Sequence, residues 1–132
     1  MIGVVLVTHG SLGVSFKNAV EHVVGRQSHF ETVCIEADDD MDRKRTEIAD
    51  AISKVGETDG VVIVTDMFGG TPSNLAISFM EMGKIEVLAG ANLPMLIKLA
   101  TERETSSMKD VLEKAQQAGR KYIHVASDVL VK

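Results

Sequence analysis

The chain has 132 residues, of which 45% are hydrophobic, so it is long and apolar enough for one folded domain with a full core. Its formal net charge of −5 argues against a nucleic-acid-binding surface, which requires an excess of Lys and Arg. Cys34 is the only cysteine, which excludes an internal disulfide, and its apolar surroundings indicate a small core residue.

The chain begins directly with an apolar strand pattern, without the charged segment and cleavage site of a signal peptide. No apolar run approaches the length of a membrane span. We therefore expect a single domain over residues 1–132 that is soluble, lies in the cytoplasm and inserts no segment into the membrane.

Short apolar runs alternate with helix-like stretches along the chain. Residues 2–8 are apolar on both faces, as in the central strand of a parallel sheet, and residues 15–25 have apolar side chains three and four positions apart, as in an amphipathic helix. A second, more mixed strand is predicted at 30–36. An acidic stretch at 38–42 follows, and one of its Asp residues is expected to cap a helix at 41–55.

The second half of the chain continues this alternation. A strand at 61–66 is followed by a Gly-Gly turn. Thr71 and Pro72 are typical of the cap and the first position of a helix, which is predicted to reach Met82. The remaining predicted elements are a strand at 85–89, a helix at 92–100, a helix at 108–118 that ends at Gly119, and a final strand at 122–131 whose mixed polarity is typical of a sheet edge.

This order of elements predicts an α/β fold, a doubly wound and mostly parallel sheet with helices on both faces and right-handed crossovers. A flavodoxin-like strand order, 2-1-3-4, places the first and third strands side by side where the winding reverses. Ligands of such sheets bind at the carboxyl ends of the strands at that point. The functional residues are therefore expected where the first and third strands end.

The first and third strands share one sequence pattern and end on different functional side chains. Residues 3–9 (GVVLVTH) match residues 60–66 (GVVIVTD) position for position, so His9 and Asp66 are expected to lie side by side. A carboxylate that accepts a hydrogen bond from Nδ1 holds one tautomer of an imidazole and leaves Nε2 free to react. We therefore predict that His9 and Asp66 form the catalytic pair.

A glycine-rich turn that leads into a helix follows Asp66. Backbone N–H groups of Gly69 and Gly70 and hydroxyls of Thr71 and Ser73 suit an anion at this point. The turn is neither a P-loop nor a dinucleotide fingerprint, so the phosphate is not expected to belong to a nucleotide. The other histidines form no cluster at metal-ligand spacing, and we expect no metal and no cofactor. Covalent phosphoryl transfer through histidine is the simplest chemistry that these residues support.

Two further features lie near this pair in the sequence. Met67 and Phe68 are large apolar residues in a turn, so one of them is expected to be exposed and to contact a partner. Asp38, Asp39 and Asp40 indicate a solvated loop that follows the second strand and could reach the rim of the site.

Three motifs follow one another along nearly the whole chain: Thr8-His9-Gly10, residues 66–74 (DMFGGTPSN) and residues 89–96 (AGANLPML). In this order they resemble the IIA domain of the mannose family of the bacterial phosphoenolpyruvate-dependent sugar phosphotransferase system. The resemblance implies that Nε2 of His9 is phosphorylated and that Asp66 orients the ring. It also implies that backbone and hydroxyl groups near Gly10, Ser11 and Thr71 hold the phosphoryl group.

The same resemblance implies partners. A histidine phosphocarrier protein would donate the phosphoryl group and a IIB domain would accept it. The family is typically dimeric, with the last strand, 122–131 here, exchanged between subunits and added antiparallel to the partner's sheet. The chain departs from the family at Phe68, where members often have Trp, and in its acidic residues 38–40.

Two other functions would use the same residues. A regulatory protein of a phosphorelay would bind its target according to the phosphorylation of His9, because the phosphoryl group adds about two negative charges. A small hydrolase would use His9 as base and Asp66 as orienter, with Ser11 or Thr71 as nucleophile.

Overall fold

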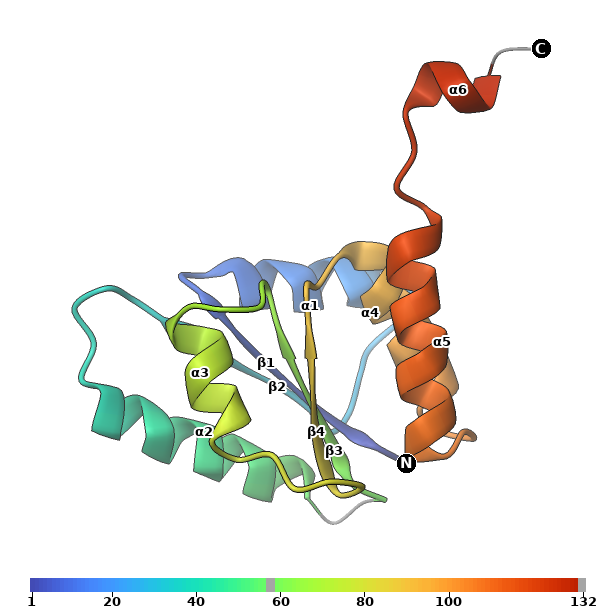
Figure 1. Ribbon diagram of the computed structural model, residues 1–132. Helices are drawn as coiled ribbons and strands as arrows, with labels where there is room; N and C mark the ends of the chain where they lie inside the picture. The colour runs from blue at the N-terminus through green and yellow to red at the C-terminus, as the bar shows by residue number, and fades with distance from the viewer. Residues whose placement is uncertain (57–58, 131–132) are drawn as a thin grey trace.

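The computed structural model describes residues 1–56 and 59–130 and contains a four-stranded parallel sheet (Figure 1). The strand order is β2-β1-β3-β4, which confirms the predicted order. β1 and β3 are therefore central, and β2 and β4 form the two edges. The strands are β1 (Gly3–His9), β2 (Phe30–Ile35), β3 (Val61–Thr65) and β4 (Ile85–Ala89).

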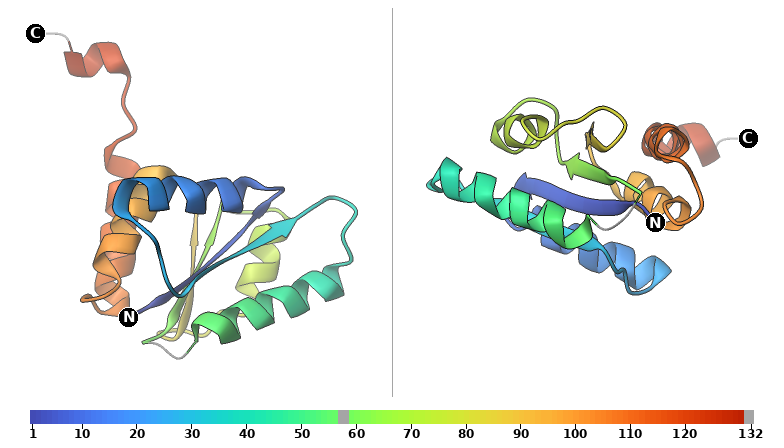
Figure 2. Two further views of the ribbon diagram at one scale, coloured as in Figure 1. Left: turned by 180° about the vertical axis from the view of Figure 1, so that it is seen from behind. Right: turned by 90° about the horizontal axis from the view of Figure 1, so that it is seen from below.

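Helices cover both faces of the sheet (Figure 2). The helices α1, α4 and α5 share one apolar core with the sheet, and α2 and α3 share the other. None of the helices in the described part of the chain combines the length and the apolar composition of a membrane span. The helices are α1 (Leu12–Val24), α2 (Met41–Val55), α3 (Thr71–Ile77), α4 (Leu93–Glu102), α5 (Met108–Lys121) and α6 (Ala126–Leu130).

The central strand β1 packs on both of its faces. Val4 and Leu6 belong to the core on the α1 side, and Val5 and Val7 belong to the core on the α2 side. All four side chains are fully buried. Each such burial stabilises the fold by roughly 1.5–3 kcal/mol, which explains why the strand is apolar at every one of these positions. The prediction of a central strand here is confirmed.

Two helices differ from their predicted bounds. α1 begins at Leu12 instead of residue 15, because the end of β1 caps it: Oγ1 of Thr8 accepts a hydrogen bond from the N–H of Gly13 at 2.8 Å. α3 ends at Ile77 instead of Met82. The chain must turn there, because the N–H of Glu81 donates to the carbonyl of Ile85 and so leads into β4.

Gly119 does not end α5, as the sequence suggested, but lies within it. A Cβ at Gly119 would lie 3.1 Å from Cε of Met95, and the carbonyl of Gly119 accepts a hydrogen bond from Nδ2 of Asn92 at 2.8 Å. The glycine therefore allows α5 to approach the start of α4 closely. α4 in turn extends two residues beyond its predicted end, to Glu102.

The strand predicted at 122–131 is not confirmed: its described part forms no strand in the single chain, and residue 131 lies outside the described residues. Within the described residues of this segment, Ala126–Leu130 form helix α6, which projects from the body of the molecule above α5 (Figure 1). Every described side chain of the segment is exposed. A strand needs a neighbouring strand for its backbone hydrogen bonds, whereas a helix forms them locally, so an unpartnered segment favours the helix.

Candidate functional site

The carboxyl ends of β1 and β3 bring His9 and Asp66 together, as predicted. The register of the two strands pairs Val7 with Thr65, which is one residue away from the alignment of the two matching sequences. Asp66 is thus level with Thr8, and its side chain bonds both the backbone and the ring of the next residue, His9. The contact is the one expected from the sequence, although the strand register is not.

Asp66 holds the imidazole of His9 in one orientation. Nδ1 of His9 lies 2.8 Å from Oδ2 of Asp66, and the backbone N–H of His9 donates to the same oxygen at 3.1 Å. The other carboxylate oxygen, Oδ1, accepts from the N–H of Met67 at 3.1 Å. Beside an ionised carboxylate Nδ1 is the donor, so the lone pair of the ring lies on Nε2.

The side chain of Asp66 is much less exposed than that of His9. The side chain of Asp66 is 11% exposed and that of His9 is 50% exposed. Burial raises the pKa of Asp66, but the hydrogen bonds from the ring and backbone N–H of His9 outweigh it, and the pKa lies below its ordinary value. The carboxylate is therefore ionised, and the ring remains accessible to a partner.

The glycine turn after β3 lies against the Nε2 side of the ring. A Cβ at Gly70 would lie 3.5 Å from Cε1 and 3.6 Å from Nε2 of His9. Gly69 and Gly70 have φ angles of 82° and 118°, which only glycine adopts without strain. Gly70, not Thr71, is the N-cap of α3, and Thr71 and Pro72 are its first two residues. The missing side chain of Gly70 leaves room beside Nε2.

The remaining predicted site residues surround this pair at different depths. Gly10 follows His9 with a φ of 52°, and Ser11 is exposed at the start of α1. Thr71 is exposed at the start of α3. Ser73 is only 1% exposed, and among the described residues its hydroxyl has no hydrogen-bond partner.

The apolar pair beside the site is more exposed than the sequence suggested. One of the two residues was expected at the surface, and both are: the residue exposures of Met67 and Phe68 are 53% and 78%. Leu12, at the start of α1, is 41% exposed. Apolar side chains at these exposures suit contact with another protein.

Sequence reasoning missed one residue at the rim of the site, Glu36. Its Oε1 lies 3.7 Å from the position that a Cβ on Gly10 would occupy. The predicted strand order could have indicated this residue, because β2 pairs with β1 and Glu36 follows β2 directly. Two of the acidic residues 38–40 serve the local structure: Asp40 caps α2, as predicted for one of these residues, and the side chain of Asp39 accepts from the N–H of Glu36.

The chain matches a family model and is similar to several known proteins. A family model described as "PTS system fructose IIA component" matches residues 3–116. The chain is 28% identical to the "PTS system fructose-specific EIIA component" of Bacillus subtilis, over the whole chain and 91% of the relative. It is 30% identical to the "PTS system sorbose-specific EIIA component" of Lacticaseibacillus casei, over 83% of the chain and 79% of the relative.

Solved structures show the same fold. The phosphotransferase system component EIIA from Streptococcus agalactiae superposes with a TM-score of 0.85 at 24% identity, covering 97% of this chain and 99% of that one. The mannose/sorbose-specific IIA subunit from Enterococcus faecalis gives 0.83 at 22% identity, covering 94% and 93%. With the family model matching most of its length, the chain belongs to the PTS fructose IIA family, the mannose-type IIA components of sugar phosphotransferase systems, which are phosphotransfer proteins.

Proposed function

We propose that the chain accepts a phosphoryl group on Nε2 of His9 from a phosphorylated histidine phosphocarrier protein. It then passes this group to a IIB component that serves sugar uptake, and the chain itself is located in the cytoplasm. The observation that carries the proposal is the 2.8 Å contact between Nδ1 of His9 and Asp66, beside a turn that leaves Nε2 open. The relatives are named after fructose, sorbose and mannose, so the proposal concerns sugars as a class.

The proposed step is an exchange of one P–N bond for another. The lone pair on Nε2 of His9 attacks phosphorus, and the bond to the donor's imidazole breaks with its electron pair returning to the donor nitrogen. As the ring gains positive character, the carboxylate of Asp66 stabilises it through Nδ1–H. In a second exchange, the acceptor's nucleophile attacks phosphorus, and the bond to Nε2 of His9 breaks with its electron pair returning to the ring.

The phosphoryl group would lie between two turns. In the proposal, the N–H groups of Gly69 and Gly70 and the hydroxyls of Ser11 and Thr71 surround its oxygens, and on the other side the backbone that follows Gly10 contributes, because the N–H of Gly10 itself donates to the carbonyl of Ile35. The closeness of Gly70 to Nε2 supports this placement. The sequence also predicts a contact from Ser73. Because this residue is buried, in the proposal its hydroxyl lies on the interior side of the turn.

Intact mass measurement tests the proposed transfer. The chain is incubated with phosphoenolpyruvate and the two general phosphotransfer proteins of a matching system, and we expect a gain of one acid-labile phosphoryl group. His9→Ala should abolish the gain, and His124→Ala, which changes an exposed histidine elsewhere, should not. Phosphorylation of His9→Ala to the same extent would refute the proposal.

A regulatory protein whose target binding depends on phospho-His9 is a second candidate, favoured by the exposure of Met67 and Phe68 beside the site. About two new negative charges next to an apolar contact surface would change its affinity for a partner. Titration of a candidate target with both phosphorylation states tests this function. Equal affinities of the two phosphorylation states, together with rapid transfer to a IIB component, would exclude the regulatory function and support the carrier function.

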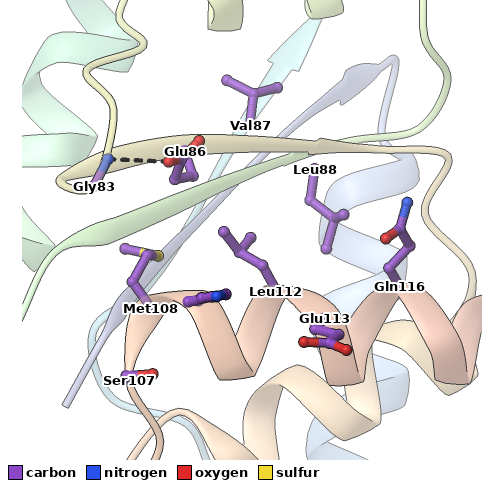
Figure 3. A pocket seen from close by; sticks show the side chains of 10 residues that line it. Gly83, Glu86, Val87, Leu88, Ser107, Met108, Leu112, Glu113 and Gln116 are labelled. Atoms are coloured by element: carbon purple, nitrogen blue, oxygen red, sulfur yellow. Dashed lines mark hydrogen bonds between the residues drawn. The ribbon is translucent and has the colours of Figure 1, made fainter.

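We further propose that the chain forms a homodimer by exchanging residues 122–131. β4 is an edge strand, and a groove of about 630 Å³ runs between it and α5. Leu88 and Leu112 point toward each other across this groove (Figure 3). The exposed apolar side chains of the C-terminal segment supply a suitable occupant: Ile123, Val125, Val129 and Leu130. An exchanged strand would lie antiparallel to β4 and cover a free edge.

Light scattering on the purified chain tests the exchange. We expect the mass of a dimer for the wild type and of a monomer for Val125→Asp, which places a charge among the apolar side chains that would be buried. His124→Asp, one residue away on the opposite face of a strand, is the matched control and should stay dimeric. A monomeric wild type at micromolar concentration would contradict the exchange.

A further inference from the structure

We propose that Glu36 weakens the hold of the site on the phosphoryl group and so makes phospho-His9 a better donor. The inference rests on the proposed function, since it concerns the phosphorylated form of His9. Glu36 lies next to Gly10 and would act on the phosphoryl group through its negative charge.

The pairing of β1 with β2 brings Glu36 to this position. His9 is level with Ile35, and the N–H of Gly10 donates to the carbonyl of Ile35 at 2.8 Å. The residues that follow, Gly10 and Glu36, therefore leave the sheet side by side. Oε1 of Glu36 lies 3.7 Å from the place of a Cβ on Gly10, the immediate neighbour of His9.

A small turn fixes the backbone of Glu36. Its N–H donates to Oδ2 of Asp39 at 2.7 Å, and the N–H of Asp39 donates back to the carbonyl of Glu36 at 3.2 Å. Lys44 lies 3.5 Å from the same carboxylate of Asp39 and neutralises part of its charge. The turn thus has its own counter-ion, and that counter-ion is not shared with Glu36.

The charge of Glu36 is not compensated by a neighbour. Asp40 is occupied as the cap of α2, and Asp42 pairs with Arg45 at 3.2 Å. Across residues 1–56 and 59–130, the side chains of Glu36 and Asp38 have no hydrogen bond or ion pair, and both are exposed. Of these two carboxylates, Glu36 is the one whose side chain reaches Gly10.

A phosphoryl group on Nε2 adds about two negative charges to His9, the residue before the glycine that Glu36 approaches. Repulsion between one charge and about two charges roughly 10 Å apart in water changes an equilibrium constant about 3-fold to 5-fold. Glu36 therefore shifts the balance toward cleavage of the P–N bond at Nε2, with the electron pair returning to the ring and the phosphoryl group bonding to the acceptor's nucleophile.

The equilibrium of transfer from a phosphorylated histidine phosphocarrier protein measures this effect. The fraction of phosphorylated chain is determined by intact mass for the wild type, Glu36→Gln and Asp38→Asn, each at about 0.01 M and about 1 M ionic strength. The Asp38→Asn variant changes the net charge equally on the same loop. At low salt we expect Glu36→Gln to raise the equilibrium constant about 3-fold, Asp38→Asn to raise it less, and high salt to remove the difference.

Four results would overturn the inference. If the wild type is phosphorylated and Glu36→Gln has the same equilibrium constant of transfer, the inference fails but the proposed function stands. The same holds if Glu36→Gln and Asp38→Asn change the equilibrium constant equally. A slower approach to the same equilibrium would show that Glu36 contacts the donor protein instead. A wild type that takes up no phosphoryl group at His9 would overturn the proposed function as well.

Discussion

At the residue scale, a single oxygen determines the geometry of the site. Oδ2 of Asp66 accepts both the ring and the backbone N–H of His9, so the ring is fixed relative to the end of β1. An ionised carboxylate accepts these two bonds on Oδ2 and a third, from the N–H of Met67, on Oδ1, whereas an amide side chain in the same place has only one oxygen and adds donors. The pair is therefore sensitive to a change of one atom.

Replacement of Asp66 by Asn is expected to slow the proposed phosphorylation of His9 by about 100-fold, the usual scale of a lost proton-transfer or orienting contribution. The amide can turn its NH₂ toward Nδ1 and so favour the tautomer with the proton on Nε2. Rapid-quench kinetics with a phosphorylated donor measures the rate, and circular dichroism checks that the fold is retained. A rate within 2-fold of wild type would show that tautomer control is unimportant.

Acid should remove the stabilising contribution of Asp66. Its pKa in the folded protein lies below the ordinary value of 3.8, so its carboxylate stabilises the fold above that value, and the contribution is lost as the pH falls through the lower folded pKa. The difference in unfolding free energy between wild type and Asp66→Asn should therefore decrease as the pH falls below about 4. Urea titrations at several pH values measure it; a difference that grows on acidification would contradict the sign.

At the element scale, strand and helix bounds were predictable where local signals decide them. α2 begins and ends at the predicted residues, because Asp40 caps it and its apolar face is regular. α3 and α5 were misjudged because tertiary contacts decide them: the turn into β4 shortens α3, and the contact with Met95 keeps Gly119 inside α5. The sequence alone does not distinguish a glycine that allows close packing from one that ends a helix.

Gly119→Val should therefore destabilise the fold by about 1–3 kcal/mol, the usual cost of overpacking a close contact. The added side chain would begin 3.1 Å from Cε and 3.2 Å from Cβ of Met95. Gln117→Val places the same residue at an exposed position of α5 and is the control, expected to change stability by less than about 0.5 kcal/mol. Urea denaturation compares the two, and equal effects would disprove the packing role.

At the scale of the whole molecule, Arg103 joins the amino ends of the sheet. Its guanidinium is buried and donates to the carbonyls of Ile2, Ser28 and His29 and to the side-chain oxygen of Gln27. Burial lowers the pKa of this arginine from its ordinary value, and it nevertheless stays charged, since arginine does not deprotonate in proteins. The segment before β2, the start of β1 and the end of α4 are connected by this one side chain.

Arg103→Ala should lower the free energy of unfolding by about 3–5 kcal/mol, because the buried carbonyls lose their donors. Arg103→Lys keeps the charge but cannot donate in the same planar fork, so an intermediate loss is expected. Chemical denaturation measures both variants. Full stability in Arg103→Lys would show that charge alone, rather than the fork, is required.

The sheet and its site could be predicted from the chain alone, because apolar strands, glycine turns and the matching strand ends are local patterns. The C-terminal segment could not, since its conformation depends on whether a second strand is present to pair with it. Glu36 was missed for a related reason: its closeness to Gly10 follows from the pairing of β1 with β2, and no sequence motif marks it.

The double contact of Asp66 with His9 also limits how this site can be engineered. Because one of the two hydrogen bonds comes from the backbone, the pair cannot be transplanted as two side chains grafted onto a helix or a foreign loop. A designer would have to carry the end of β1, the turn after β3 and their relative offset as one block. Swapping whole strand–turn units between related scaffolds is therefore the practical route to a redesigned site.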